Sequence, residues 1–218
     1  TLKADEVQIS ALAKGGKSLL ADNLIFTGDM LGSVMGQSGI AEFSATELSK
    51  QLTGKNARAS IGVGDYEHAL NAGGSPKDIE TILQLVYLNF TAPRFDETDL
   101  ANMKKMYVPY FKNMEADPNY IVGKEFQKTI YGDHVRRQIT SAEQIEAINI
   151  PSLQAIHSKL FGYADDFRFV IVGNVDLETL KPMVEKYAGS LPKGKKGTKV
   201  DEAKMIQMVK GVTDDNTL

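Results

Sequence analysis

The hydrophobic residues of the first segment alternate with polar ones. Four of them lie two positions apart, ahead of a Gly-Gly pair: Val7, Ile9, Ala11 and Ala13. This repeat predicts a strand with one buried face. Residues 56–63 and 66–72 predict two more strands, joined at Gly64-Asp65 as a hairpin. Residues 167–173 are almost wholly apolar, which predicts a fourth strand near the centre of the sheet, buried on both faces.

The first helix is predicted over residues 19–35. Its apolar residues recur mostly at helical spacing: Leu20, Leu24, Leu31 and Met35. Gly28, Gly32 and Gly36 fall at every fourth position, which would give one helix face a groove of small residues for a closely packed element. In a membrane this spacing would indicate helix pairing, but the stretch carries Asp22 and Asp29, so we expect a helix of a soluble domain.

Capping and stop signals bound the other predicted helices. Ser44 and Glu47 have the spacing of a capping box and open a short helix that ends at Gly54. Ser75 and Pro76 open the next helix as cap and first residue. Pro93 is predicted to end that helix. Further helices are predicted over 96–115 (kinked or split at Pro109), 117–130, a short piece from Ser141, 150–160 and 176–188.

The order of these elements predicts the fold class. Strands and helices are partly segregated along the chain instead of alternating strictly. That order favours an α+β fold, with helices packed on one face of a mostly antiparallel, twisted sheet.

Composition excludes several classes of protein. The 218 residues are 42% hydrophobic, which fits one large domain or two small ones. The lack of cysteine excludes a disulfide framework, a Cys-ligated zinc and a thiol nucleophile. With 25 basic and 28 acidic residues and no basic stripe, a nucleic-acid partner is not expected. No apolar run approaches the ~20 residues of a membrane span.

The ends of the sequence predict the domain boundaries. The chain begins at Thr1 without a signal peptide, and we interpret it as a piece of a longer protein. Residues 193–199 are rich in Lys and Gly, typical of a solvated linker. Residues 205–209 are apolar and predict a short strand. We therefore expect one domain over 1–192, and a linker with the start of the following domain over 193–218.

The residues alone assemble no active site. The three histidines (His68, His134 and His157) have no second His or Glu at ligand spacing, so each is expected to be a solvated or hydrogen-bonded structural residue. Asp133-His134 with Asp165-Asp166 could bind a cation, but Asp-rich loops are more often turns and caps. A G-x-S-x-G elbow and a Gly-rich phosphate loop are both absent. From its residues the chain is a scaffold or interaction domain.

Three segments together resemble a known family. They are residues 83–96 (LQLVYLNFTAPRFD), residues 166–176 (DFRFVIVGNVD) followed by 187–192 (YAGSLP), and residues 38–43 (SGIAEF). Across residues 5–192 the sequence resembles the pitrilysin/insulinase family of zinc metallopeptidases, particularly its bacterial members with two homologous halves. The resemblance implies a metallopeptidase-half fold of the LuxS/processing-peptidase type.

The resemblance also implies where catalysis would lie. Family enzymes carry His-x-x-Glu-His on an early helix, with two His on zinc, the Glu as base and a later Glu as further ligand. The segment in that place reads Glu42-Phe43-Ser44-Ala45-Thr46, so both His and the base are replaced, and the later Glu falls near Tyr110. We therefore expect no catalytic, cofactor-binding or metal residue in this chain. Zinc is expected in the catalytic half of the parent protein.

The function implied by the resemblance is that of a non-catalytic domain of a zinc-dependent endopeptidase. Such a domain forms part of the peptide-binding chamber opposite the catalytic half, and its partners are that half and a peptide. The Arg and Tyr that a silent half contributes to the active site are expected beyond Leu218.

Two other functions stay open from the sequence. One is a catalytically dead partner or scaffold subunit of a two-chain peptidase or larger complex. The other is an unrelated ligand site at the Asp and His loops. A bacterial periplasm or envelope location is implied only by analogy with the family.

Overall fold

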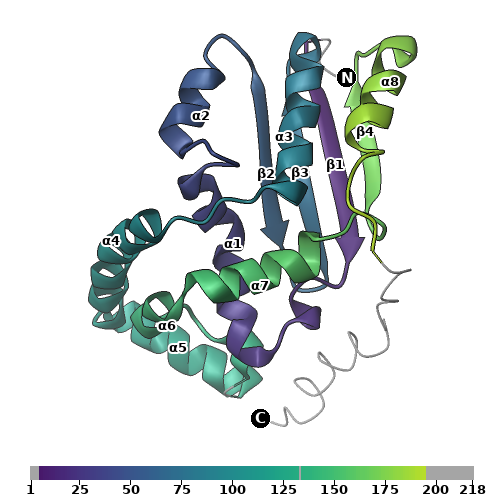
Figure 1. Cartoon of the computed structure of the whole chain (residues 1–218). Helices are drawn as coiled ribbons and strands as arrows, with labels where there is room; N and C mark the ends of the chain where they lie inside the picture. Colours follow the sequence, from purple (N-terminus) through teal and green to yellow (C-terminus); the bar gives the residue numbers. More distant parts are fainter. Residues whose placement is uncertain (1–4, 133, 195–218) are drawn as a thin grey trace.

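The computed structural model describes residues 5–132 and 134–194. In this part of the chain four strands form one antiparallel sheet in the order β2-β3-β1-β4. Their bounds are β1 Val7–Lys14, β2 Ala57–Val63, β3 Glu67–Gly74 and β4 Arg168–Gly173. Figure 1 shows the sheet with one face covered by helices. The predicted α+β class and the four strands predicted within the described residues are confirmed.

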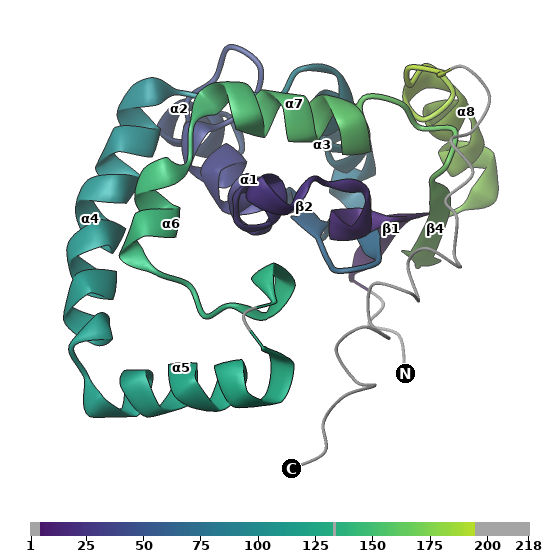
Figure 2. The ribbon, with the colours of Figure 1, turned by 90° about the horizontal axis from the view of Figure 1, so that it is seen from below.

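The helices form two groups. Those against the sheet are α1 Ile25–Ser38, α3 Ile79–Thr91, α7 Ile150–Phe161 and α8 Leu177–Tyr187, with the short α2 Ala45–Gln51 beside them. The second group is α4 Glu97–Glu115, α5 Pro118–Tyr131 and α6 Ala142–Ala147. Figure 2 shows α4 and α5 meeting at a corner at one end of the molecule, away from α8 and β4. None of the described helices is both long and apolar enough to cross a membrane.

The core lies between the sheet and the first group of helices. On β1 the alternation is as predicted: Val7, Ile9, Ala11 and Ala13 are at most 2% exposed, while the residues between them face the other side. The helices contribute the largest fully buried side chains, among them Leu31, Ile82, Leu83, Leu153, Ile156 and Phe161. Burial of these apolar surfaces is the main stabilising contribution to the fold.

The glycines of α1 let that helix touch the sheet. A Cβ on Gly32 would lie 2.2 Å from the carbonyl oxygen of Ile61 on β2, so only glycine allows this approach. A Cβ on Gly28 would meet Leu20 Cδ1 at 2.7 Å, whereas a Cβ on Gly36 would have nothing within 4 Å. The predicted close approach of another element is therefore found at Gly32, whereas the neighbour of Gly28 is a flexible side chain.

Several predicted element boundaries were wrong. Residues 16–24 form two short 3-10 turns, so α1 begins at Ile25 instead of Leu19. The side chain of Ser75 makes no cap hydrogen bond, and the turn after it, Pro76–Asp78, is 3-10 instead of the start of α3. Pro109 lies inside α4 without splitting it, and the Asp96 carboxylate caps that helix by accepting from Thr98 N and Asp99 N.

The predicted central position of the fourth strand was also wrong. β4 pairs only with β1 among the described residues and lies at an edge of the sheet. Its alternate side chains Val170 and Val172 are 48% and 41% exposed. Residues 195–218, with the expected linker and the strand over 205–209, lie outside the described residues except for Lys193 and Gly194.

Candidate functional site

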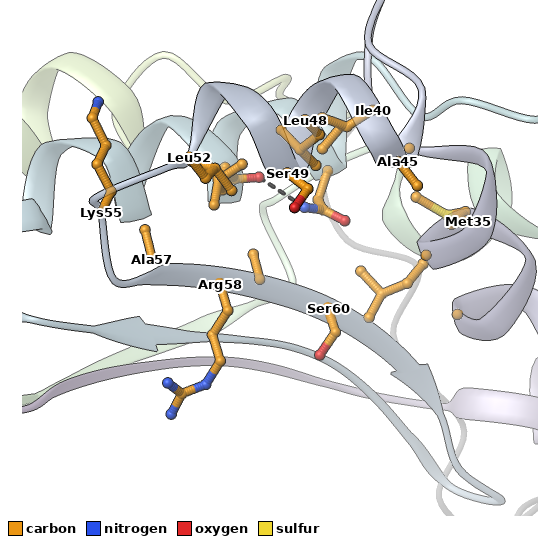
Figure 3. A pocket seen from close by; sticks show the side chains of 17 residues that line it. Met35, Ile40, Ala45, Leu48, Ser49, Leu52, Lys55, Ala57, Arg58 and Ser60 are labelled. Atoms are coloured by element: carbon orange, nitrogen blue, oxygen red, sulfur yellow. Dashed lines mark hydrogen bonds between the residues drawn. The ribbon is translucent and has the colours of Figure 1, made fainter.

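A pocket of about 460 Å³ lies between α2 and the edge strand β2. Figure 3 shows α2 on one side, with Leu48 and Leu52, and β2 on the other, with Ala57. The end of α1 closes the pocket near Met35. The small side chains of β2 leave the space open, because larger residues there would fill the gap below α2.

The lining is mostly apolar with two basic residues. None of its residues is acidic among those the structure describes. Lys55 Nζ donates to Thr81 Oγ1 at 3.0 Å, and an Arg58 guanidinium nitrogen lies 3.2 Å from Glu6 Oε1. Asn89 at the base of the pocket is 7% exposed and donates to Leu85 O at 2.8 Å. An apolar cavity with a few polar groups suits a neutral or weakly acidic organic chain.

The free backbone edge of β2 can be assigned from the hairpin. Gly64 N donates to Glu67 O at 2.8 Å, and Ser75 N donates to Asn56 O at 2.9 Å. In an antiparallel ladder alternate residues point their backbone groups to opposite sides. The even-numbered residues of β2 therefore bond to β3, and the N–H and C=O groups of Ala57 and Ala59 point away from β3 at the open edge.

Helix α2 on the far side of the pocket depends on its cap. It has seven residues, none of them buried. Ser44 Oγ accepts from Glu47 N at 3.3 Å, and Glu47 Oε2 accepts from Ser44 N at 2.9 Å, so the predicted capping box is confirmed. Ser44 Oγ also donates to Glu47 Oε2 at 2.7 Å, and this bond, together with the one from Ser44 N, lowers the pKa of Glu47. The capping box thus fixes one wall of the pocket.

The segment compared with the zinc motif does not lie on one helix. Ile40 and Phe43 pair across a tight turn, in which Ala41 has a φ of 51°. Glu42 lies in that turn, Ser44 is the cap, and α2 begins only at Ala45. Two ligands four residues apart share a helix face only if all the residues between them are helical. This segment therefore lacks the geometry of a His-x-x-Glu-His motif, whatever its side chains.

The residues present do not fit a zinc site. Tyr110, near the expected place of the later Glu, is 55% exposed on α4 and makes an edge contact with Phe111. Groups of three or more His, Asp or Glu that could hold a metal do not occur in residues 5–132 and 134–194. We therefore derive no chemical step through a metal in this chain.

Two of the histidines lie inside the core, where both contact the same phenylalanine, Phe161. His68 on β3 is 5% exposed and accepts from Gly16 N at 3.3 Å through Nδ1, and His157 on α7 is 3% exposed. Both rings contact Phe161, with centroids 5.3 and 5.6 Å away. Burial lowers the pKa of His68 to about 4, and burial also lowers the pKa of His157. Both are neutral structural residues, as expected from the sequence.

The other candidate groups bring no ligand site together. His134 accepts from Arg136 N at 3.3 Å as a cap, while Asp133 lies outside the described residues. Asp165 accepts from Gly194 N. Gly173 ends β4, and the Asp176 carboxylate caps α8 by accepting from Thr179 N at 3.0 Å, so that strand exit has a structural explanation.

Sequence reasoning missed the pocket and the open edge of β2. The hairpin was predicted, but its position at the sheet edge depends on pairing between distant segments. A usable signal was the small residues Ala57 and Ala59 in a strand that follows the helix with the glycine groove.

Comparison with known sequences identifies related proteins. Residues 147–212 match the Peptidase M16 inactive domain. The chain is 23% identical over 154 residues to the probable zinc protease PqqL of Escherichia coli K12, covering 71% of this chain and 16% of that protein. It is 26% identical over 176 residues to a zinc protease PQQL-like protein of Arabidopsis thaliana, covering 80% and 18%. The chain thus spans under a fifth of the length of these curated relatives.

Solved structures share the fold. The periplasmic protease PqqL from Escherichia coli superposes with a TM-score of 0.75 at 21% identity, covering 88% of this chain and 21% of that one. The peptidase M16 inactive domain from Pseudomonas fluorescens superposes with a TM-score of 0.70 at 18% identity, covering 89% and 47%. Together, these findings show that the chain has the fold of M16 peptidase domains and is similar to the Peptidase M16 inactive domain over residues 147–212.

Proposed function

We propose that this domain contacts peptide substrate in a zinc-dependent endopeptidase whose catalytic half lies elsewhere on a longer polypeptide. In that enzyme the domain forms part of the chamber wall opposite the catalytic half. Zinc belongs to the catalytic half in this proposal, and a periplasmic location is supported by the similarity to PqqL of Escherichia coli, which is a periplasmic protease.

The pocket beside the open edge of β2 carries the proposal. An extended peptide can add to an exposed sheet edge through main-chain hydrogen bonds, with its side chains in neighbouring pockets. Ala57 and Ala59 offer the free backbone groups, and the apolar space under Leu48 and Leu52 is wide enough for side chains of a peptide. The length of the relatives supports a catalytic half on the same polypeptide.

The test measures peptide binding and cleavage separately. A fluorescein-labelled, uncharged peptide of about ten residues is titrated with the chain, and binding is followed by anisotropy. Ala59→Pro removes an edge N–H without touching a β2–β3 hydrogen bond, and Ala59→Ser is the matched control that keeps the donor. We expect binding by the chain and by Ala59→Ser, and about fivefold weaker binding by Ala59→Pro, since a lost hydrogen bond costs about 1 kcal/mol.

Two outcomes contradict the proposal. One is equal or undetectable binding for all three proteins. The other is cleavage of a fluorogenic peptide by the purified chain with added zinc, or a stoichiometric calorimetric zinc-binding isotherm, because the chain would then hold its own active site.

A further inference from the structure

Asn89 on α3 is a buried polar residue in the lining of the pocket between α2 and β2. It is 7% exposed. The rest of the lining is mainly apolar, with Leu48 and Leu52 on the side of α2 (Figure 3). Burying a polar group is unfavourable unless the group is hydrogen-bonded. The hydrogen bonds of Asn89 therefore show whether the fold needs its side chain.

The fold does not need the side-chain amide of Asn89. Its Nδ2 donates to Leu85 O at 2.8 Å. In an α-helix that carbonyl already accepts from the backbone N–H four residues later, which is the N–H of Asn89 itself. Leu85 O would thus keep a partner without the side chain. Asparagine is also disfavoured in helix interiors, so a leucine at this position would serve the core at least as well.

The amide of Asn89 is held in one orientation with its oxygen free. Only Nδ2 can donate to a carbonyl, so the bond to Leu85 O fixes which end of the amide is which. The backbone is fixed as well, because Pro93 has no N–H for the Asn89 carbonyl and His157 Nε2 donates to it instead, at 2.8 Å. Among the described residues no donor bonds to Asn89 Oδ1, and this atom is not fully enclosed. Asn89 Oδ1 is therefore a fixed hydrogen-bond acceptor that is open to the pocket.

Small residues in the lining leave room for a ring. Ala57 and Ala59 of β2 present only methyl groups. Gly36 of α1 also lines the pocket, and a Cβ there would have nothing within 4 Å. The volume of about 460 Å³ falls in the range of sites for small organic molecules. The space between α2 and β2 is therefore large enough for an aromatic side chain.

The chemistry of the lining restricts which side chain can fill this space. A lysine would bring a donor, but the described lining contains Lys55 and Arg58 and no acidic residue, so a buried ammonium group would lose its water without gaining a counter-charge. A phenylalanine would fill the apolar space and displace water from Asn89 Oδ1 without replacing its hydrogen bond. A tyrosine combines the apolar ring with a hydroxyl donor, and buried tyrosine hydroxyls usually have a hydrogen-bond partner.

We propose that the pocket selects peptides that carry a tyrosine, whose hydroxyl group donates to Asn89 Oδ1. The inference rests on the proposed function, because it takes the peptide to lie along the free edge of β2. Residues directly opposite each other on paired strands point to the same face of the sheet. The tyrosine is therefore the peptide residue opposite Ala59, which lines the pocket, while its two neighbours in the peptide point to the other face.

Two peptides that differ by one oxygen atom test the inference. Both are uncharged and fluorescein-labelled, and one has a central tyrosine where the other has phenylalanine. Binding to residues 1–218 is measured by anisotropy. We expect the tyrosine peptide to bind about tenfold more tightly, because the phenylalanine peptide leaves the desolvated oxygen of Asn89 without a partner.

A pair of variants assigns this preference to one residue. Asn89→Leu replaces the amide by an apolar group of similar branched shape. In this variant the phenylalanine peptide should bind at least as tightly as the tyrosine peptide, because the hydroxyl group then has no acceptor. Asn113→Leu makes the same change at an exposed position of α4 outside the pocket. This matched control should keep the preference for tyrosine.

A measurement on the unaltered chain covers the case in which Asn89→Leu does not fold. The NMR frequency of the side-chain carbonyl carbon of Asn89 responds to a hydrogen bond accepted by Oδ1. We expect the tyrosine peptide to shift this resonance to higher frequency and the phenylalanine peptide to shift it less. Equal shifts with the two peptides would contradict the proposed hydrogen bond.

Equal affinities of the unaltered chain for the two peptides overturn the inference, and so does a preference for tyrosine that survives Asn89→Leu. These results are distinct from a failure of the proposed function. If both peptides bind equally and Ala59→Pro weakens both, peptide binding at β2 stands and only the selection of tyrosine is lost. If neither peptide binds, both proposals are contradicted.

Discussion

His157 on α7 donates from Nε2 to the carbonyl oxygen of Asn89 on α3, at 2.8 Å. Its ring stacks on Phe161, which also makes an edge contact with the ring of His68. The two histidines therefore join α7, α3 and the sheet from inside the core as uncharged groups.

The domain should lose stability in mild acid because of these histidines. Burial lowers the pKa of His68 from 6.5 to about 4 and also lowers that of His157, so the unfolded chain takes up protons first as pH falls. The contribution of His68 to the free energy of unfolding is complete above pH 6.5, decreases as the pH falls below that value, and levels off below about pH 4. The His68 contribution is about 3 kcal/mol, at 1.36 kcal/mol per pH unit.

Urea unfolding at pH 7.5 and pH 4.5 measures this loss. In His68→Gln the difference between the two pH values should shrink, because glutamine keeps the hydrogen-bonding groups but does not titrate. His134→Gln, a change at a partly exposed loop residue, is the control and should keep the full difference. An unchanged pH dependence in His68→Gln would rule out this origin.

Two glycines of α1 should respond oppositely to alanine. Gly32→Ala places a methyl group against the Ile61 carbonyl, which we expect to cost about 1–3 kcal/mol of unfolding free energy through overpacking. Gly36→Ala meets nothing within 4 Å and should stabilise the helix by about 0.5–1 kcal/mol. Thermal unfolding of the two variants checks the pair, and equal shifts in midpoint would contradict the close approach of α1 to β2.

Short-range chemistry explains what the sequence predicted well. Ser44 with Glu47, Ser141 with Gln144 and Asp117 with Pro118 each fix a helix start within a few residues, and all three starts are present. The alternation of β1 likewise needs only its own residues and one buried face.

The features that were missed depend on distant segments. Nothing within residues 167–173 indicates that β4 has a paired strand on one side only among the described residues, so this apolar strand was placed at the centre of the sheet. The 3-10 turns before α1 are fixed from afar, since Arg136 donates to Lys17 O and Leu20 O across more than a hundred residues. The turn at Ala41 also could not be predicted from residues 42–46 themselves, and it keeps that segment from forming one helix with α2.

The capping box of α2 should control local opening of the pocket. Ser44→Ala removes the side-chain acceptor for Glu47 N, a change that typically costs about 1 kcal/mol. Because α2 has no buried residue, the loss should appear as faster amide exchange in α2, with little change in global unfolding. Ser49→Ala, within the same helix, is the matched control and should leave exchange unchanged or slower.

Acid should weaken the same cap. The Ser44 hydrogen bonds lower the pKa of Glu47, so its contribution is present above the ordinary value of 4.5 and is lost as pH falls through the lowered value. Exchange of α2 amides, corrected for the intrinsic pH effect, should therefore rise in that range. Glu47→Gln should remove most of the dependence, and a dependence that survives it would assign the effect to another group.

The attachment of the loop after α5 should depend on Arg136 far more than on Arg137. The Arg136 guanidinium donates to Lys17 O at 2.8 Å and Leu20 O at 3.2 Å and pairs with Asp22 at 3.1 Å. Its side chain is 14% exposed, whereas that of Arg137 is 40% exposed and reaches Asp65 at 3.5 Å. Arg136→Ala leaves the carbonyl groups of Lys17 and Leu20 without this donor, which costs about 1–3 kcal/mol of unfolding free energy. An exposed ion pair such as that of Arg137 contributes less than about 1 kcal/mol. Limited proteolysis should therefore cut near residues 134–140 faster in Arg136→Ala than in Arg137→Ala, and equal rates would show that the arginine at 136 does not hold this loop.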